Sequence, residues 1–132
     1  MKLAAATLLV RDYDEAIAWF RTALAWEVSE DVRLGGDKRW VMVRPPQGGA
    51  ALLLARATNA QQGAAVGAAA GGRVAFFVHT GSIAAEMPRM KAAGVEFEED
   101  VRAESYGKVA VFRDLYGNRW DLIEPAATGE TG

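Results

Sequence analysis

The second half of this chain repeats the first half when the two are aligned at an offset of 69 residues. The matched segments begin at Trp26 and Val95, at Arg39 and Lys108, and at Gly48 and Gly117. A long period that occurs only twice does not suit a solenoid, which stacks several shorter repeats to bury their faces. The repeat predicts two copies of a βαβββ module packed around a shared cleft, and we expect function where the copies meet.

Composition removes several classes of function. The chain has 132 residues, of which 51% are hydrophobic, and this suits one domain with a real core. The formal net charge is −2 and the basic residues are scattered, which argues against a nucleic-acid partner. There is no cysteine, so disulfides, thiolate metal sites and a cysteine nucleophile are excluded. The single histidine, His79, excludes a multi-histidine metal site within one chain.

The first ten residues imitate a short signal peptide, because one lysine precedes an apolar run. Arg11 and Asp12 end this run without a small-residue cleavage site, and the run matches a strand in the repeat. No stretch reaches the roughly 18 unbroken apolar residues of a membrane-spanning helix. We therefore expect a cytoplasmic protein with no membrane partner.

In the first half, residues 4–10 predict a buried strand. Asp12 with Glu15 three residues later predicts a helix start, and apolar residues at helical spacing follow it. Glycine- and proline-rich turns then separate strands expected at 26–32, 39–44 and 50–55.

The second half predicts the same order of elements. We expect a strand at 73–78, a helix within 82–93 that ends at Gly94, and strands near 95–100, 108–113 and 119–124. Pro88 lacks an N–H and crowds the preceding turn, so the helix is expected either to kink there or to begin only near Glu86.

The boundaries follow from these elements. We expect one domain over residues 1–125, made of module one (1–57), a connector (58–72) and module two (73–125). The connector is low in complexity and nearly free of charge, which favours a flexible linker, with a mobile lid as the alternative. The tail, 126–132, is expected to be disordered.

Three segments carry a family resemblance. They are Leu8-Leu-Val-Arg-Asp-Tyr-Asp-Glu-Ala-Ile-Ala-Trp-Phe20, Met90-Lys-Ala-Ala-Gly-Val-Glu-Phe97 and Tyr106-Gly-Lys-Val-Ala-Val-Phe-Arg-Asp-Leu-Tyr-Gly-Asn-Arg-Trp-Asp-Leu-Ile-Glu124. With the repeat they make the chain resemble the vicinal oxygen chelate superfamily, which includes glyoxalase I, bleomycin-resistance proteins and extradiol dioxygenases. The resemblance implies an α+β fold of two βαβββ modules, with mixed sheets curved around a central cleft and helices outside.

The resemblance also implies where a metal would bind. In enzymes of this superfamily, four strands each supply one His, Gln or Glu to a divalent ion. Those positions fall here at Ala5, Leu52, Arg73 and Asp121, of which only Asp121 could bind a metal. We therefore expect no metal and no other cofactor, and metal-dependent glyoxalase or dioxygenase activity is not expected.

Strand alternation predicts what occupies the cleft instead. Arg73, Ala75 and Phe77 should share one face of their strand. The simplest register of the 45–49 turn pairs Met42 with Leu52 and Trp40 with Leu54, and the same register pairs Val111 with Asp121. The predicted ligand-binding residues are Arg73, Asp121, Phe77, Trp40 and Tyr106.

Arg73 and Asp121 have two interpretations. They could form an ion pair that fills the space of the metal, since buried charges are tolerated when paired. Alternatively, Arg73 presents its guanidinium to an anionic group of a ligand while Asp121 holds it in place. The candidates for proton transfer are Asp121, Tyr106 and Glu124, whereas His79 is expected to face solvent or cap a turn. The acidic run from Glu96 to Asp100 is interpreted as a solvated strand edge.

Three functions remain open. The first is a metal-free module that binds a small, partly apolar organic molecule, with an anionic group on it as one form of the hypothesis. The second is a metal-independent lyase or isomerase that uses Asp121, Glu124 or Tyr106 with Arg73. The third is an interaction or regulatory domain with a vestigial cleft. Each is compatible with a homodimer, since an exposed sheet edge invites pairing.

Overall fold

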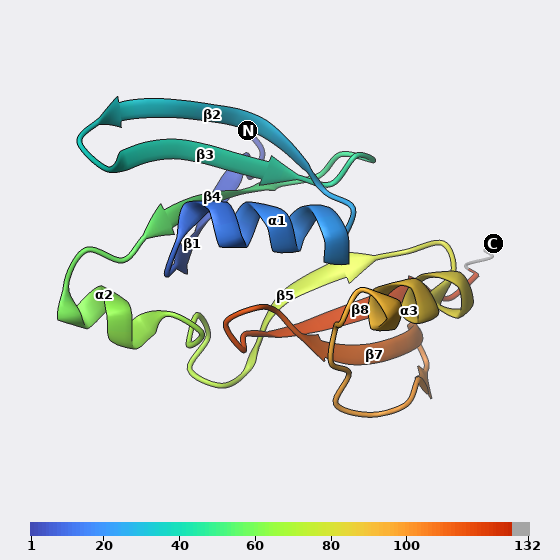
Figure 1. Cartoon of the computed structure of the whole chain (residues 1–132). Coiled ribbons are helices and arrows are strands. Elements are labelled where there is room, and N and C mark those ends of the chain that lie inside the picture. The colour runs from blue at the N-terminus through green and yellow to red at the C-terminus, as the bar shows by residue number, and fades with distance from the viewer. Residues whose placement is uncertain (128–132) are drawn as a thin grey trace. The chain divides into compact units, whose positions relative to one another are not determined.

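A computed structural model describes residues 1–127. The chain divides into two compact units, Met1–Ala69 and a second that begins at Ala70, so the boundary falls within the predicted connector. Each unit contains one four-stranded mixed sheet, which confirms the expected pair of βαβββ-like modules (Figure 1). Of the predicted tail, 126–132, residues 128–132 lie outside the described residues.

Module one contains β1 (Ala5–Val10), α1 (Tyr13–Ala23), β2 (Glu27–Gly35), β3 (Lys38–Arg44) and β4 (Ala51–Arg56). Its strand order is β1-β4-β3-β2, in which β1 and β4 are parallel and the other neighbours antiparallel. In Figure 1, α1 runs alongside β3 and β4. The predicted start of this helix is confirmed, because the Asp12 side chain accepts a hydrogen bond from the Glu15 N–H at 2.9 Å.

The register of the first hairpin differs from the prediction by one residue. Met42 pairs with Leu53, and Val43 pairs with Leu52. The connection between β3 and β4 has six residues, 45–50, one more than its counterpart at 114–118 in module two. A shift of one residue exchanges the faces of a strand. Leu52 therefore turns to the face that carries α1, and Leu53 takes the position expected of Leu52.

The side chains on the α1 face of this sheet form the core of module one. Arg39 marks that face, because its guanidinium binds Asp14 of α1 at 2.9 Å and lies over the ring of Tyr13. Alternation from Arg39 puts Val41 and Val43 on the same face, where both are fully buried. The core is completed by Leu8, Val10, Ala16, Ile17, Phe20, Leu52 and Leu54.

The connector is not entirely irregular. It contains a short helix, α2 (Ala60–Ala65), which begins where the Asn59 side chain accepts a hydrogen bond from the Gln62 N–H at 2.8 Å. This short helix within the connector was not predicted from the sequence. It forms for a local reason, because Asn is among the strongest N-cap residues and alanine the best helix former.

Module two contains β5 (Val74–His79), α3 (Ile83–Ala92), β6 (Arg102–Glu104), β7 (Gly107–Arg113) and β8 (Arg119–Pro125). Its strand order is β5-β8-β7-β6, which mirrors the order in module one. Val111 pairs with Asp121, as predicted. Aromatic rings on one face of the sheet form a row of contacts, in which Phe112 stacks on Trp120, while Phe76 and Trp120, and Phe97 and Phe112, pack at a tilt.

The helix expected within 82–93 is confirmed as α3, and the alternative of a start near Glu86 is wrong, because Ser82 caps the helix and the exposed Pro88 lies inside it. One prediction for module two needs correction. The strand expected at 95–100 is reduced to a single bridge between Phe97 and Phe112, and the paired strand is β6. Residues 96–98 do lie along β7, but ladder pairing then stops and resumes only at Arg102, whose side chain binds Glu99 across the break at 2.6 Å.

Within residues 1–127, no helix has the length and apolar character needed to cross a membrane.

Candidate functional site

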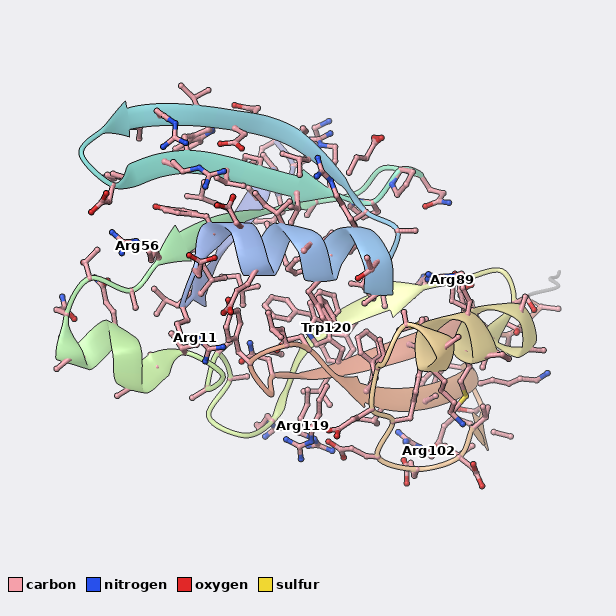
Figure 2. All side chains as sticks on the ribbon, viewed as in Figure 1. Arg11, Arg56, Arg89, Arg102, Arg119 and Trp120 are labelled. Carbon is pink, nitrogen blue, oxygen red and sulfur yellow. The ribbon has the colours of Figure 1, made fainter. Side chains whose placement is uncertain are left out.

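The two faces of the sheet in module two carry different chemistry. Glu124 lies on the face that carries α3, because its carboxylate accepts a hydrogen bond from the Ile83 N–H, at the start of that helix, at 2.9 Å. Alternation places Leu122 and Trp120 on the same face, where both are buried. Asp121 and Ile123 therefore point to the opposite face, which we call the Asp121 face. Figure 2 shows Arg119 and Trp120, neighbours in β8, on opposite sides of the sheet.

Apolar side chains flank Asp121 on both neighbouring strands. Phe77 of β5 and Val111 of β7 are its register partners and share its face. Val111 is buried, whereas Phe77 leaves 62% of its surface exposed. The face thus combines a carboxylate with an exposed aromatic ring.

Asp121 itself is buried, and one of its two carboxylate oxygens has no hydrogen-bond partner among the described residues. It is 8% exposed, and its Oδ1 atom has no donor within the described part of the chain. Burial raises the pKa of this carboxyl, while the positive charges of Arg102 and Arg119 oppose the rise. An unpaired buried acceptor is unusual in a folded protein and costs stability.

The arginines near Asp121 are already occupied by other acids. Arg119 binds both carboxylate oxygens of Glu98, at 2.8 and 3.0 Å, and Arg113 reaches the same carboxylate at 3.2 Å. The hydrogen bonds from Arg119 lower the pKa of Glu98. Arg102 binds Glu99 at 2.6 Å and Glu104 at 2.7 Å.

These pairs also change the interpretation of the acidic run. Glu98 and Glu99 were expected to be solvated residues of a strand edge, but both are held by guanidinium groups. Glu98 pairs with arginines of β7 and β8, and Glu99 pairs with an arginine of β6. These two acids therefore attach the segment that contains them to the sheet.

The predicted pairing of Arg73 with Asp121 is not found among the described residues. Arg73 precedes β5 and is exposed, and the positive charges that act on Asp121 belong to Arg102 and Arg119. The alternation used to place Arg73 beside Phe77 also fails, because the ladder shifts register between Val74 and Phe76. Such a bulge puts two residues of one strand opposite one of its partner and reverses the sequence of faces.

The other residues predicted for the site in module two do not lie together. Tyr106 lies in the turn before β7, is 52% exposed and shares a hydrogen bond with Arg102 that helps to raise the pKa of that guanidinium. His79 is exposed at the end of β5. Glu124 is on the opposite face from Asp121 and is bound to the start of α3. The structure therefore joins Phe77 to Asp121 on one face and separates Glu124 from them.

Module one has a corresponding face, away from α1, on which Trp40 and Met42 lie. Trp40 is 41% exposed, and its indole N–H donates to Glu30 at 2.9 Å. Arg44 is on the same face by alternation, and its Nε is buried without an acceptor in the described residues.

Arg44 is a candidate that sequence reasoning missed. The signal was present in the repeat, because Arg44 aligns with Arg113 and Ser29 aligns with Glu98. Arg113 has its acid, whereas Ser29 instead donates its hydroxyl hydrogen to the Met42 carbonyl at 3.4 Å. Module one thus has an arginine at this position, but a serine stands where the acidic partner would be.

The structure shows where the four positions lie that the resemblance assigned to metal ligands. Ala5 and Leu53 are on the face of module one that carries Trp40, and Leu53 replaces Leu52 in this set. In module two the positions are Arg73 and Asp121. Within residues 1–127, no group of three or more His, Cys, Asp or Glu side chains is arranged to hold a metal ion.

Comparisons with known proteins agree with this architecture. A sequence model of the Glyoxalase/Bleomycin resistance protein/Dioxygenase superfamily matches residues 2–122. An uncharacterized protein from Shewanella frigidimarina (strain NCIMB 400) is 44% identical over 119 residues, which cover 89% of this chain and 88% of the relative.

Solved structures show the same fold. UcmS2 superposes with a TM-score of 0.81 at 27% identity, covering 94% of this chain and 98% of that chain. TnmS3, an antibiotic binding protein from Streptomyces sp. CB03234, superposes with a TM-score of 0.75 at 19% identity, covering 96% of this chain and 97% of that chain. The modules, their strand orders and the extent of the family match lead to one conclusion. The chain belongs to the glyoxalase/bleomycin resistance protein/dioxygenase superfamily.

Proposed function

We propose that this chain binds a small, partly apolar organic molecule on the Asp121 face of module two, without the metal ion that enzymes of the superfamily use. The observation that carries the proposal is the buried Oδ1 atom of Asp121, which has no hydrogen-bond donor among residues 1–127, beside the exposed ring of Phe77. Ligand sites typically combine apolar and aromatic walls with a few polar groups that fix orientation.

The residues at the metal positions do not fit a divalent ion. Ala5 and Leu53 carry no side-chain atom that could bind a metal, and the guanidinium of Arg73 offers no lone pair to a cation. Asp121 alone cannot replace the several oxygen or nitrogen ligands that such sites need. A role for Asp121 that does not involve a metal is therefore the better match to its surroundings.

The fold supports the same proposal. TnmS3, whose fold is similar, is an antibiotic binding protein. Module one, considered by itself, offers a separate candidate for binding an anion, because the Nε of Arg44 is buried without an acceptor in the part of the chain that the structure describes.

A thermal-shift screen of antibiotics and aromatic metabolites, run with EDTA and again with added Mg²⁺, Mn²⁺, Ni²⁺ or Zn²⁺, tests the proposal. We expect at least one compound to raise the melting temperature equally in both conditions. At a ligand concentration of 100 Kd the stabilisation is about 2.7 kcal/mol, which is several degrees for a domain of this size. Phe77→Ala should abolish the shift, whereas Leu3→Ala, at an exposed position outside the strands, should preserve it. A screen without stabilising compounds, or shifts that need the divalent ion, would contradict the proposal.

A metal-independent lyase or isomerase is the second candidate, and one observation favours it. Burial raises the pKa of Asp121, and a carboxyl with a raised pKa holds a proton to a higher pH than an ordinary carboxyl does. Glu124 is a weaker candidate for this chemistry because it is bound to the Ile83 N–H. Turnover that survives EDTA and disappears in Asp121→Asn would favour the enzyme over the binding module.

We further propose a homodimer formed through module one. Strand β2 is an edge strand, and Val32, Leu34 and Trp40 on the β2–β3 hairpin expose about half of their surfaces. Exposed apolar residues along a free strand edge favour association. Light scattering should give the mass of a dimer for the natural chain and of a monomer for Leu34→Lys, with Leu3→Lys as the control. A monomeric natural chain would contradict this part.

A further inference from the structure

Two buried aspartates of module two differ sharply in their partners. Asp114 accepts hydrogen bonds from the Tyr116 and Asn118 N–H groups, from the Asn118 amide and from the Trp120 indole, all between 2.9 and 3.0 Å. Asp121 is equally buried, yet its Oδ1 receives none within the described residues. A buried acceptor without a hydrogen bond lowers the stability of the folded chain. A ligand that donates a hydrogen bond to this oxygen would restore the lost interaction.

The charges around Asp121 favour a ligand group that donates a hydrogen bond over an anionic group. The charged groups that act on Asp121 are the guanidinium groups of Arg102 and Arg119 and the carboxylates of Glu98 and Glu99. Every one of these four groups already has an ionic partner. With Asp121 included, carboxylates exceed guanidinium groups by one, so an additional anion would find no free cation there.

The immediate neighbours of Asp121 define the rest of the ligand. Phe77 and Val111 are its register partners, and Phe77 offers an exposed ring face. Ile123, two residues along β8, extends the apolar surface. A flat apolar ring fits these side chains, since aromatic rings stack in offset or edge-to-face geometry.

We infer that the ligand of the Asp121 face is an aromatic molecule with a hydroxyl or protonated amine on its ring system, which donates its hydrogen to the Asp121 carboxylate. This rests on the proposed function and deepens it, because it replaces an anion with a donor as the group recognised in module two. Selectivity follows from the unpaired acceptor: an analogue that lacks the donor leaves Asp121 buried and unsatisfied.

Matched naphthalenes test the inference. Calorimetry would compare 2-naphthol and 2-naphthylmethylamine, which carry a donor, with 2-methoxynaphthalene, which has none, and with the anion 2-naphthoate. A hydrogen bond to a charged acceptor predicts that the two donors bind at least about tenfold more tightly than 2-methoxynaphthalene. In Asp121→Leu this preference should disappear, while 2-methoxynaphthalene still binds. Asp37→Asn is the control. It changes an exposed acid in the turn between β2 and β3, and it should keep the preference.

Stability measurements on the unliganded protein give a second readout. Asp121→Leu removes an unsatisfied acceptor and should melt no lower than the natural chain, whereas Asp114→Leu removes a satisfied one and should melt well below it. A clear loss of stability in Asp121→Leu would show that the carboxylate has structural partners, and would overturn the inference.

The outcomes separate the inference from the proposed function. Equal affinities for 2-naphthol and 2-methoxynaphthalene, or tightest binding of 2-naphthoate, overturn the inference and leave small-molecule binding intact. Absence of binding by all the naphthalenes overturns the inference, and together with an empty antibiotic and metabolite screen it overturns the proposed function as well.

Discussion

The indole N–H of Trp120 donates a hydrogen bond to the carboxylate of Asp114 at 3.0 Å, and thereby joins β8 to the turn that precedes it. Both residues are buried, and the Trp120 ring also contacts the rings of Phe76 and Phe112. The turn and the aromatic core of module two are thus one connected unit. This connection fixes β8, and with it the direction in which Asp121 points.

Asp114→Ala should therefore destabilise the fold strongly. It removes the carboxylate to which the Tyr116 and Asn118 N–H groups and the Trp120 indole donate, and we expect the free energy of unfolding to fall by about 2–4 kcal/mol. Urea unfolding followed by tryptophan fluorescence measures the change. Asp37→Ala, at an exposed turn residue, should alter stability by less than about 0.5 kcal/mol. Similar values for the two variants would show that the Asp114 network contributes little.

Gly107→Ala should also be costly, for a steric reason. Gly107 has φ +145°, and an added Cβ would lie 2.9 Å from both the Ala126 nitrogen and the Pro125 Cα, with the Glu124 carbonyl oxygen closer still. Strain in φ combined with a backbone clash predicts a loss above about 2 kcal/mol. Gly36→Ala is the matched control, because Gly36 has φ +56° but open space around it. A smaller loss for Gly107→Ala than for Gly36→Ala would contradict the close approach of β7 and β8.

Glu124 should behave as a helix-capping residue. Its carboxylate accepts the hydrogen bond of the Ile83 N–H, so Glu124→Ala should lower the free energy of unfolding by about 1 kcal/mol. Glu124→Gln retains an acceptor oxygen and should lose less. Melting temperatures of the two variants measure the difference. If instead both retain full stability and lose ligand binding, Glu124 belongs to the site and not to the helix start.

The fold could be predicted from the sequence because its signals are local and occur twice. Asp12 and the apolar spacing after it define α1, and the turn between β7 and β8 has the length that the simplest register assumes, so Val111 pairs with Asp121 as predicted. The one-residue error in module one arose in the 45–50 connection, which is longer than its repeat. Loop length is the weakest signal in a sequence, yet it decides which residues share a face.

The candidate site was less predictable, because it depends on which charges meet. Asp121 and Phe77 could be placed together by alternation, since their strands are regular at that point. Arg73 could not, because the bulge between Val74 and Phe76 leaves no mark in the sequence. Pairing of Glu98 with Arg113 and Arg119 joins residues that are 15 and 21 positions apart, which periodicity does not detect.

The raised pKa of Asp121 predicts how stability depends on pH. Below the ordinary carboxyl pKa of 3.8 the group is protonated in both the folded and the unfolded chain, and it imposes no penalty. As the pH rises through the ordinary value and then the raised one, the folded chain must bury a charge that the unfolded chain exposes to water. The natural chain should therefore lose stability relative to Asp121→Asn across this window, and the difference should level off above it.

Glu98→Gln should show the opposite trend, because the pKa of Glu98 is lowered by Arg119 and its stabilising contribution is lost as the pH falls. Urea unfolding of the three proteins at a series of pH values measures both trends, and a pH-independent difference for Asp121→Asn would mean that the carboxyl is solvated in the folded state.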